Sequence, residues 1–317
     1  MNASPRHRPP PAAILLVPLV VAVVLALFAW PSARLEPRDL PIGVAGAPAA
    51  AAAVEQRLAQ RPGAFDIKRY RDDPAARSAI EDREVYGAFV VTPAGGKVLT
   101  ASAASPLVAQ LLTQAAAETA AEPLPVEDVV ASSPRRTALA SSVLPLVIAG
   151  ILTGVAGSLL ASGFAGRAAL VGAGSILAGL VATAIVQSWL DVLEGDWWAN
   201  AAVLSLTIAA IAAVVAGLNA LIGRAGILIA ALTMVLVGNP FSGVAAAPEL
   251  LPRPVGGRGQ LFPPGAGGSL LRDTAYFDGA GAGGHVVVLA VWVIAGLVLL
   301  LVAARRGGHA GAPAVVS

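Results

Sequence analysis

Side chains that commonly carry catalytic or metal-binding chemistry are few and scattered in this chain of 317 residues. The absence of cysteine excludes a disulfide, a thiol nucleophile and a thiolate metal site. The three histidines, His7, His285 and His309, are too far apart in the sequence to indicate a metal site. No Gly-x-x-x-x-Gly-Lys-Ser/Thr phosphate loop is present, so ATP hydrolysis would need a second protein. We therefore expect neither enzyme activity nor a bound cofactor or metal.

Acidic residues lie next to basic ones rather than in pairs of their own. Glu81, Asp82 and Glu84 are interleaved with Arg77 and Arg83. This pattern is typical of a solvated charged surface and not of two catalytic carboxylates. A membrane enzyme therefore has no supporting group of residues.

The long apolar segments contain no Asp, Glu, Lys or Arg. Ion-coupled transporters usually mark their pathway with such residues. We expect the remaining polar side chains to be hydrogen-bonding partners between helices rather than substrate ligands. The spacing of Gly150 and Gly154 favours close helix packing. The candidates for helix packing or a pathway are Gly150, Gly154, Asn219 and Gln187, and the other polar residues are Thr153, Ser175, Thr183, Ser205 and Thr207.

A proline-rich segment, 239–284, holds more apolar residues than a freely solvated loop would need. Short helices, or a re-entrant turn that dips into the outer membrane interface, would account for them. An ordered cap without further function is the alternative. The candidate residues of this loop are Asn239, Pro240, Gly243 and Arg272.

Composition predicts that lipid solvates most of the chain. Hydrophobic residues make up 56%, charged residues 13%, and the mean hydropathy is +0.76. A bilayer core needs about 20 apolar residues per helix, and six segments qualify or nearly qualify. A cleaved signal peptide is the alternative for the first, but its apolar run is long for one. The predicted parts are an arm (1–11), a first span (12–30), a soluble domain (31–137), four spans (138–238), the loop (239–284), a last span (285–304) and a tail (305–317).

Charges between these segments predict the orientation. Arginines concentrate on the cytoplasmic side of membrane proteins. With the N-terminus inside, all 19 acidic residues fall outside. Both termini are therefore expected inside. Six arginines then face the cytoplasm: Arg6, Arg8, Arg167, Arg224, Arg305 and Arg306.

The segment 31–137 follows the pattern of a soluble protein. Short apolar runs at 40–45, 65–70, 85–91, 97–102 and 126–131 predict strands, and the stretches 49–60, 73–84 and 106–122 between them predict helices. Alternating strands and helices indicate a small sheet with helices packed on it. The predicted fold is an α-helical polytopic membrane protein, with about six transmembrane helices and an inserted extracytoplasmic α/β domain.

Several short motifs carry a resemblance. They are Val85-Tyr-Gly-Ala-Phe-Val-Val-Thr-Pro93, Asn239-Pro-Phe-Ser-Gly243, Leu270-Leu-Arg272 and Tyr276-Phe277. With the domain order, they resemble membrane proteins of the phage-infection-protein (YhgE/Pip-like) group, which are related to permease subunits of type-2 ABC exporters. The resemblance implies an inside N-terminus, re-entrant helices in the last outer loop, and export powered by a separate ATPase on the cytoplasmic face.

Two functions remain open. The first is a permease-like export subunit for a hydrophobic or amphipathic substrate. Such a subunit would lie in the lipid bilayer as a homo- or hetero-oligomer, with a separate ATPase subunit as its partner. No nucleic-acid partner is expected. The second is a non-transporting cell-envelope protein whose outer domain binds a partner or a surface polymer. The very short inner loop 162–167 fits the second, because a permease normally receives force through such a loop. Arginine-rich, lysine-poor composition indicates a GC-rich bacterial gene and hence the bacterial cytoplasmic membrane.

Overall fold

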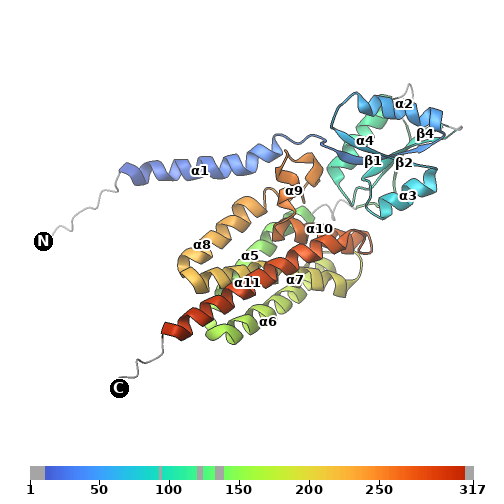
Figure 1. Cartoon of the computed structure of the whole chain (residues 1–317). Helices are drawn as coiled ribbons and strands as arrows, with labels where there is room; N and C mark the ends of the chain where they lie inside the picture. Colours follow the sequence, from blue (N-terminus) through green and yellow to red (C-terminus); the bar gives the residue numbers. More distant parts are fainter. Residues whose placement is uncertain (1–10, 93–94, 120–123, 133–138, 311–317) are drawn as a thin grey trace, which may run out of the picture.

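The computed structural model describes residues 11–92, 95–119, 124–132 and 139–310. The chain forms an α/β domain at one end and a bundle of long helices at the other (Figure 1). We call the bundle end next to this domain the domain end and the opposite one the far end. The predicted arm with Arg6, His7 and Arg8 lies outside the described residues.

Five strands form one mixed sheet in the order β2-β1-β3-β4-β5. β1 pairs in parallel with β2 and β3, β3 is antiparallel to β4, and β5 is parallel to β4. Each predicted strand position is occupied, so the prediction of a small α/β sheet is confirmed. The strands are β1 (Leu40–Gly46), β2 (Phe65–Tyr70), β3 (Gly87–Thr92), β4 (Gly95–Thr100) and β5 (Val126–Asp128).

Helices cover both faces of this sheet. α2 (Pro48–Ala59) and α4 (Pro106–Thr119) pack on the face that carries Leu40 and Phe89. α3 (Asp73–Glu81) packs on the other face. The sequence starts α3 locally, because the Asp72 carboxylate accepts a hydrogen bond from the Ala75 amide at 3.0 Å and a proline follows in the first turn.

The bundle is organised around α7 (Trp197–Ile222), which packs against α5, α6, α8, α10 and α11. Its face towards α5 is made of small and β-branched side chains, and Gly150 and Gly154 of α5 lie against it. An ideal Cβ on Gly154 would lie 2.6 Å from the Ala212 carbonyl oxygen, so glycine is needed for this approach. The other bundle helices are α5 (Leu139–Leu160), α6 (Gly163–Thr183), α8 (Arg224–Leu232) and α11 (Ala282–Ala310), and the π-helical turns η2 (Ala184–Trp189) and η3 (Thr233–Gly238) extend α6 and α8.

Four of the described helices are long and apolar enough to cross a membrane, and this indicates membrane insertion. Large apolar side chains such as Leu152, Leu177 and Val291 are more than half exposed on the bundle surface. Lipid is the solvent in which such a surface is stable. The long segments are Val143–Leu160, Gly163–Trp189, Trp197–Ile222 and Ala282–Arg306, and two shorter ones are Pro18–Ser32 and Arg224–Gly238.

The first helix, α1 (Pro11–Ser32), stands apart from the bundle (Figure 1). It approaches the other helices at its domain end, near η3. Leu19 and Leu25 are each about 60% exposed (61% and 62%), so most of this helix has no protein neighbour.

The proline-rich loop is folded into short helices, as predicted. They are η4 (Pro248–Leu250), α9 (Val255–Gly259) and α10 (Pro263–Tyr276). Twelve of the 14 residues of α10 are buried, against α7 and α11 among others. α10 is therefore packed into the core of the bundle.

Hydroxyl groups in the bundle behave differently from the prediction. Thr153, Thr183 and Thr207 each donate a hydrogen bond to the backbone carbonyl four residues earlier in their own helix, at 2.8 Å. Ser205 does the same at 2.7 Å and is also 3.4 Å from the Ile176 carbonyl of α6. The expectation of bonding between helices is wrong for the three threonines, because the nearest acceptor in an apolar environment is the helix's own carbonyl.

We expect Gly154→Ala to destabilise the bundle by about 1–3 kcal/mol, because the new methyl group would overlap α7. Gly172→Ala is the matched control, since nothing lies within 4 Å of an ideal Cβ there, and alanine is the better helix former. Thermal unfolding of both variants in one detergent measures the difference. Equal melting temperatures would contradict the close α5–α7 contact.

Candidate functional site

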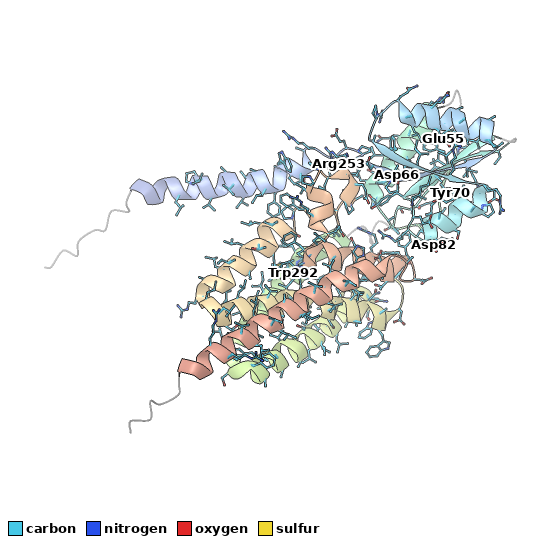
Figure 2. All side chains as sticks on the ribbon, viewed as in Figure 1. Glu55, Asp66, Tyr70, Asp82, Arg253 and Trp292 are labelled. Carbon is cyan, nitrogen blue, oxygen red and sulfur yellow. The ribbon has the colours of Figure 1, made fainter. Side chains whose placement is uncertain are left out.

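The α/β domain is attached to the proline-rich loop at the junction between the two parts. Backbone amides of Glu36 and Arg38 donate hydrogen bonds to the carbonyls of Leu250 (3.1 Å) and Glu249 (3.0 Å). The Arg38 guanidinium donates to the Leu250 carbonyl at 2.8 Å. Figure 2 shows Arg253 of the loop and Asp82 of the domain at this junction. Three hydrogen bonds therefore hold the linker after α1 against η4 of the loop.

Asp273 of α10 is the centre of a buried ion cluster at the same junction. Its side chain is fully buried, with Arg83 Nη1 3.0 Å from Oδ1 and His285 Nδ1 2.9 Å from Oδ2. Arg83 comes from the connection between α3 and β3, and His285 from the first turn of α11. One carboxylate thus joins the α/β domain, the loop and the last bundle helix.

The side chains of this cluster contact one another through different kinds of interaction. Arg83 and Asp273 are close but poorly aligned for a hydrogen bond, so their contact is an ion pair. His285 Nδ1 is within hydrogen-bond distance of the Asp273 carboxylate. The Arg83 guanidinium also lies 5.0 Å from the centre of the Phe277 ring, a cation–π contact.

Arg272 is buried beside this cluster. It donates a hydrogen bond to the Val244 carbonyl at 2.7 Å, which ties α10 to the loop. Burial and the positive charge of Arg83 lower the pKa of Arg272 to about 10, so it still carries its proton at neutral pH. Removal from water and the charge of Glu249 raise the pKa of Tyr86, whose hydroxyl donates to the Glu249 carboxylate at 2.8 Å.

One expectation about charged residues needs correction. Glu81, Asp82 and Glu84 are exposed, but Arg83 is not part of a solvated surface, because its side chain is only 15% exposed. His285 contacts Asp273. The described residues contain no group of three or more side chains that could hold a metal ion.

The two predicted amides lie near opposite ends of the bundle, with Gln187 in η2 and Asn219 in α7. Gln187 accepts a hydrogen bond from the Asn200 side chain at 3.0 Å and donates to the Gly195 carbonyl at 3.0 Å, at the domain end. Asn219 lies at the far end, where its backbone carbonyl accepts a hydrogen bond from the Gly223 amide at 2.8 Å. The two therefore do not form one site.

Asn239, Pro240 and Gly243 lie where the loop meets the end of α1. They line a cavity of 210 Å³ together with Phe28 and Ser32, among others. Gly243 has a φ of +68°, and an ideal Cβ would lie 2.9 Å from the Pro248 nitrogen. Glycine is therefore required for this turn.

Sequence reasoning missed Asp273 and Asn200. Asn200 is fully buried, donates to the Glu194 carbonyl at 2.6 Å and accepts from the Thr274 hydroxyl at 2.9 Å. A charged pair, Arg272-Asp273, in the middle of a buried helix was the available signal for the cluster. Nothing in the sequence indicates its partners.

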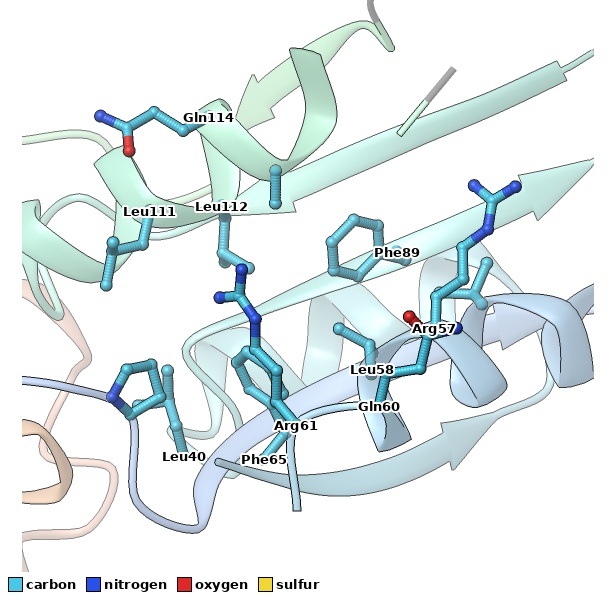
Figure 3. A pocket seen from close by; sticks show the side chains of 13 residues that line it. Leu40, Arg57, Leu58, Gln60, Arg61, Phe65, Phe89, Leu111, Leu112 and Gln114 are labelled. Carbon is cyan, nitrogen blue, oxygen red and sulfur yellow. The ribbon is translucent and has the colours of Figure 1, made fainter. Parts of the chain in front are cut away.

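A cavity of 510 Å³ opens in the α/β domain between α2 and α4 (Figure 3). Apolar side chains that include Leu58, Phe65 and Leu112 form its walls, and Arg57 and Arg61 stand at its edge. A second cavity, of 710 Å³, lies beside Phe277 and is bordered by acidic residues such as Glu81. The two cavities therefore present opposite charges.

We expect Asp273→Asn to weaken the junction by about 3–5 kcal/mol, because Arg83 would lose the charge that neutralises it. Hydrogen exchange of the α3 and α10 amides should become faster in this variant. Glu81→Gln, an exposed change on α3 beside the junction, should leave exchange unaltered. Equal protection in both variants would argue against a structural role for the cluster.

No protein-family model, curated protein or solved structure matches this chain. Its function is therefore inferred from its own residues.

Proposed function

We propose that this chain is a multi-pass protein of the bacterial cytoplasmic membrane, with both termini inside and the α/β domain outside. The start of α1 and the end of α11 lie on the side away from that domain (Figure 1), which supports six crossings in alternating directions. Arg167, Arg224, Arg305 and Arg306 belong to the far end, where the positive-inside tendency would place them. The two shorter apolar helices then count as spans.

We further propose that it is the membrane subunit of an export system for a hydrophobic or amphipathic substrate. The contact of Asp273 with Arg83 and His285 carries this proposal. A domain that is only anchored needs one helix and a flexible linker. Here a buried charge cluster fixes the domain to α10 and α11, so a displacement of the last helix would be transmitted to the domain. The resemblance to exporter permeases points the same way.

The chemistry of the bundle limits the energy source and the cargo. Its spanning helices carry no Asp, Glu, Lys or Arg in their central turns, which disfavours coupling to ions. The chain also lacks a phosphate loop. Energy would come from a separate ATPase, and an apolar or amphipathic molecule is the cargo that such a surface can accommodate.

A second candidate is a non-transporting envelope protein that binds a ligand through its outer domain. It is favoured by the short turns at the far end. Ala161 and Ser162 alone separate α5 from α6, and Gly223 alone separates α7 from α8. Neither turn offers an ATPase a coupling helix.

Single cysteines test the orientation, because the natural chain has none. We expect a membrane-impermeant maleimide to label Ser78→Cys on α3 in intact cells. Ala225→Cys on α8 should be labelled only after the cells are opened. Both positions are exposed. Labelling of Ala225→Cys in intact cells would reverse the proposed orientation.

Purification in mild detergent from native membranes tests the export role. We expect an ATP-hydrolysing subunit to co-purify with the chain. Arg224→Gln and Arg306→Gln should weaken this association, because they change the far end where such a subunit must bind, whereas Arg71→Gln on the outer domain should not. If no ATPase co-purifies and only outer-face partners do, the second candidate replaces the first.

A further inference from the structure

We propose that the cavity between α2 and α4 binds an amphiphile with one or more alkyl chains and an anionic head, such as a phosphate or a carboxylate. This inference depends on the proposed function for the role of the ligand as cargo or signal. Binding itself can be measured whether or not the chain exports anything.

The walls of the cavity match an alkyl chain. They combine the sheet residues Leu40, Phe65 and Phe89 with Leu58 of α2 and Leu111 of α4. Its volume of 510 Å³ is within the range of about 300–1,000 Å³ that is usual for small-molecule sites. An alkyl chain would fill space that the two helices leave open above the sheet.

The edge of the cavity matches an anion. Among the described residues that line it, none is acidic, and the two charged ones are arginines, Arg57 and Arg61. Figure 3 shows the Arg61 side chain reaching from the end of α2 towards Leu112 of α4. No hydrogen bond or ion pair to the Arg61 side chain occurs within the described ranges. A guanidinium above an apolar floor would bind a phosphate or carboxylate through paired hydrogen bonds.

The position of the cavity suits a ligand that comes from the membrane. Pro37, in the linker between α1 and β1, is one of the lining residues. This linker follows the domain end of α1, where the helix would leave the outer leaflet. The loop residues Ala246, Ala247 and Leu250 pack into the same core as the cavity walls. A molecule at the outer interface would therefore have a short path to the cavity. The cavity beside Phe277 has an acidic border and would repel the same head group.

Photolabelling of the whole chain in phosphatidylcholine nanodiscs tests this site. The probe is dodecyl phosphate with a terminal diazirine, and its matched control is the same chain on a trimethylammonium head. Mass spectrometry should find the phosphate probe on peptides that contain Leu58, Phe65 or Leu111, and the cationic probe much less. Unlabelled dodecyl phosphate should compete with the probe for these peptides.

Variants of the chain distinguish binding in the cavity from non-specific partitioning of the probe into lipid. Arg61→Gln should lower phosphate labelling about tenfold, and Leu58→Trp should block it by filling the cavity. Arg71→Gln, an exposed arginine away from the cavity, should have no effect. Three results would overturn the proposal. The two probes could label the chain equally, or the label could be confined to the membrane helices. The third is equal phosphate labelling of Arg61→Gln and Arg71→Gln.

Two further arms identify the source of the ligand and separate the two proposals. Loss of labelling in phosphatidylglycerol nanodiscs would assign the site to a membrane lipid. Competition by added fatty acid alone would assign it to a free amphiphile. Failed labelling with a co-purifying ATPase would refute this site and leave the export role, whereas retained labelling without an ATPase would do the reverse.

Discussion

Asp273 is a carboxylate that water does not reach, and its neutralisation constrains the arrangement of the whole molecule. An unpaired charge in such a place would cost several kcal/mol. The compensating groups come from Arg83 in the α/β domain and His285 at the start of α11. Neither part can move away without breaking a contact to this carboxylate. The cluster therefore holds the two parts in one relative position.

The position of the cluster follows from the two solvents of the protein. The bundle has apolar side chains on its surface and is stable in lipid, whereas the α/β domain has charged surfaces and an apolar core of its own. Polar groups at the boundary between the two parts cannot rely on water for their hydrogen bonds, and lipid chains offer none. They are satisfied by one another instead, through the Asp273 cluster, the amides of Gln187 and Asn200, and the pairing of the linker with Leu250.

The two ends of the bundle differ in complexity. At the domain end the chain folds η4, α9 and α10 into the core, and α10 brings Arg272 and Asp273 to the junction. At the far end the described connections are turns of one or two residues. The Asp273 cluster thus lies on the side of the α/β domain. The cavity with its two arginines lies on this side as well, next to the linker that leads out of α1.

The α/β sheet was predictable, because alternation of apolar residues and turn signals are local properties of a sequence. The positions of five strands followed from them. Hydropathy likewise located the long apolar helices, since the length of an uncharged segment decides whether it can cross lipid. It also predicted spans at α1 and at α8 with η3, where the structure has shorter apolar helices.

The candidate site was not predictable in the same way. Asp273 and Arg272 stand out as charges within an apolar segment, but no local pattern relates them to Arg83 or His285. The threonines of the bundle were assigned to neighbouring helices although their own helix supplies the nearer acceptor. The cavity walls come from α2, α4 and the sheet, segments that meet only after folding. Hydropathy and periodicity act over a few residues, so the sequence alone determines whether each segment lies in water or lipid and whether it is a helix or a strand. Ion pairs and cavities depend on which distant segments become neighbours. Only the tertiary structure decides which segments meet.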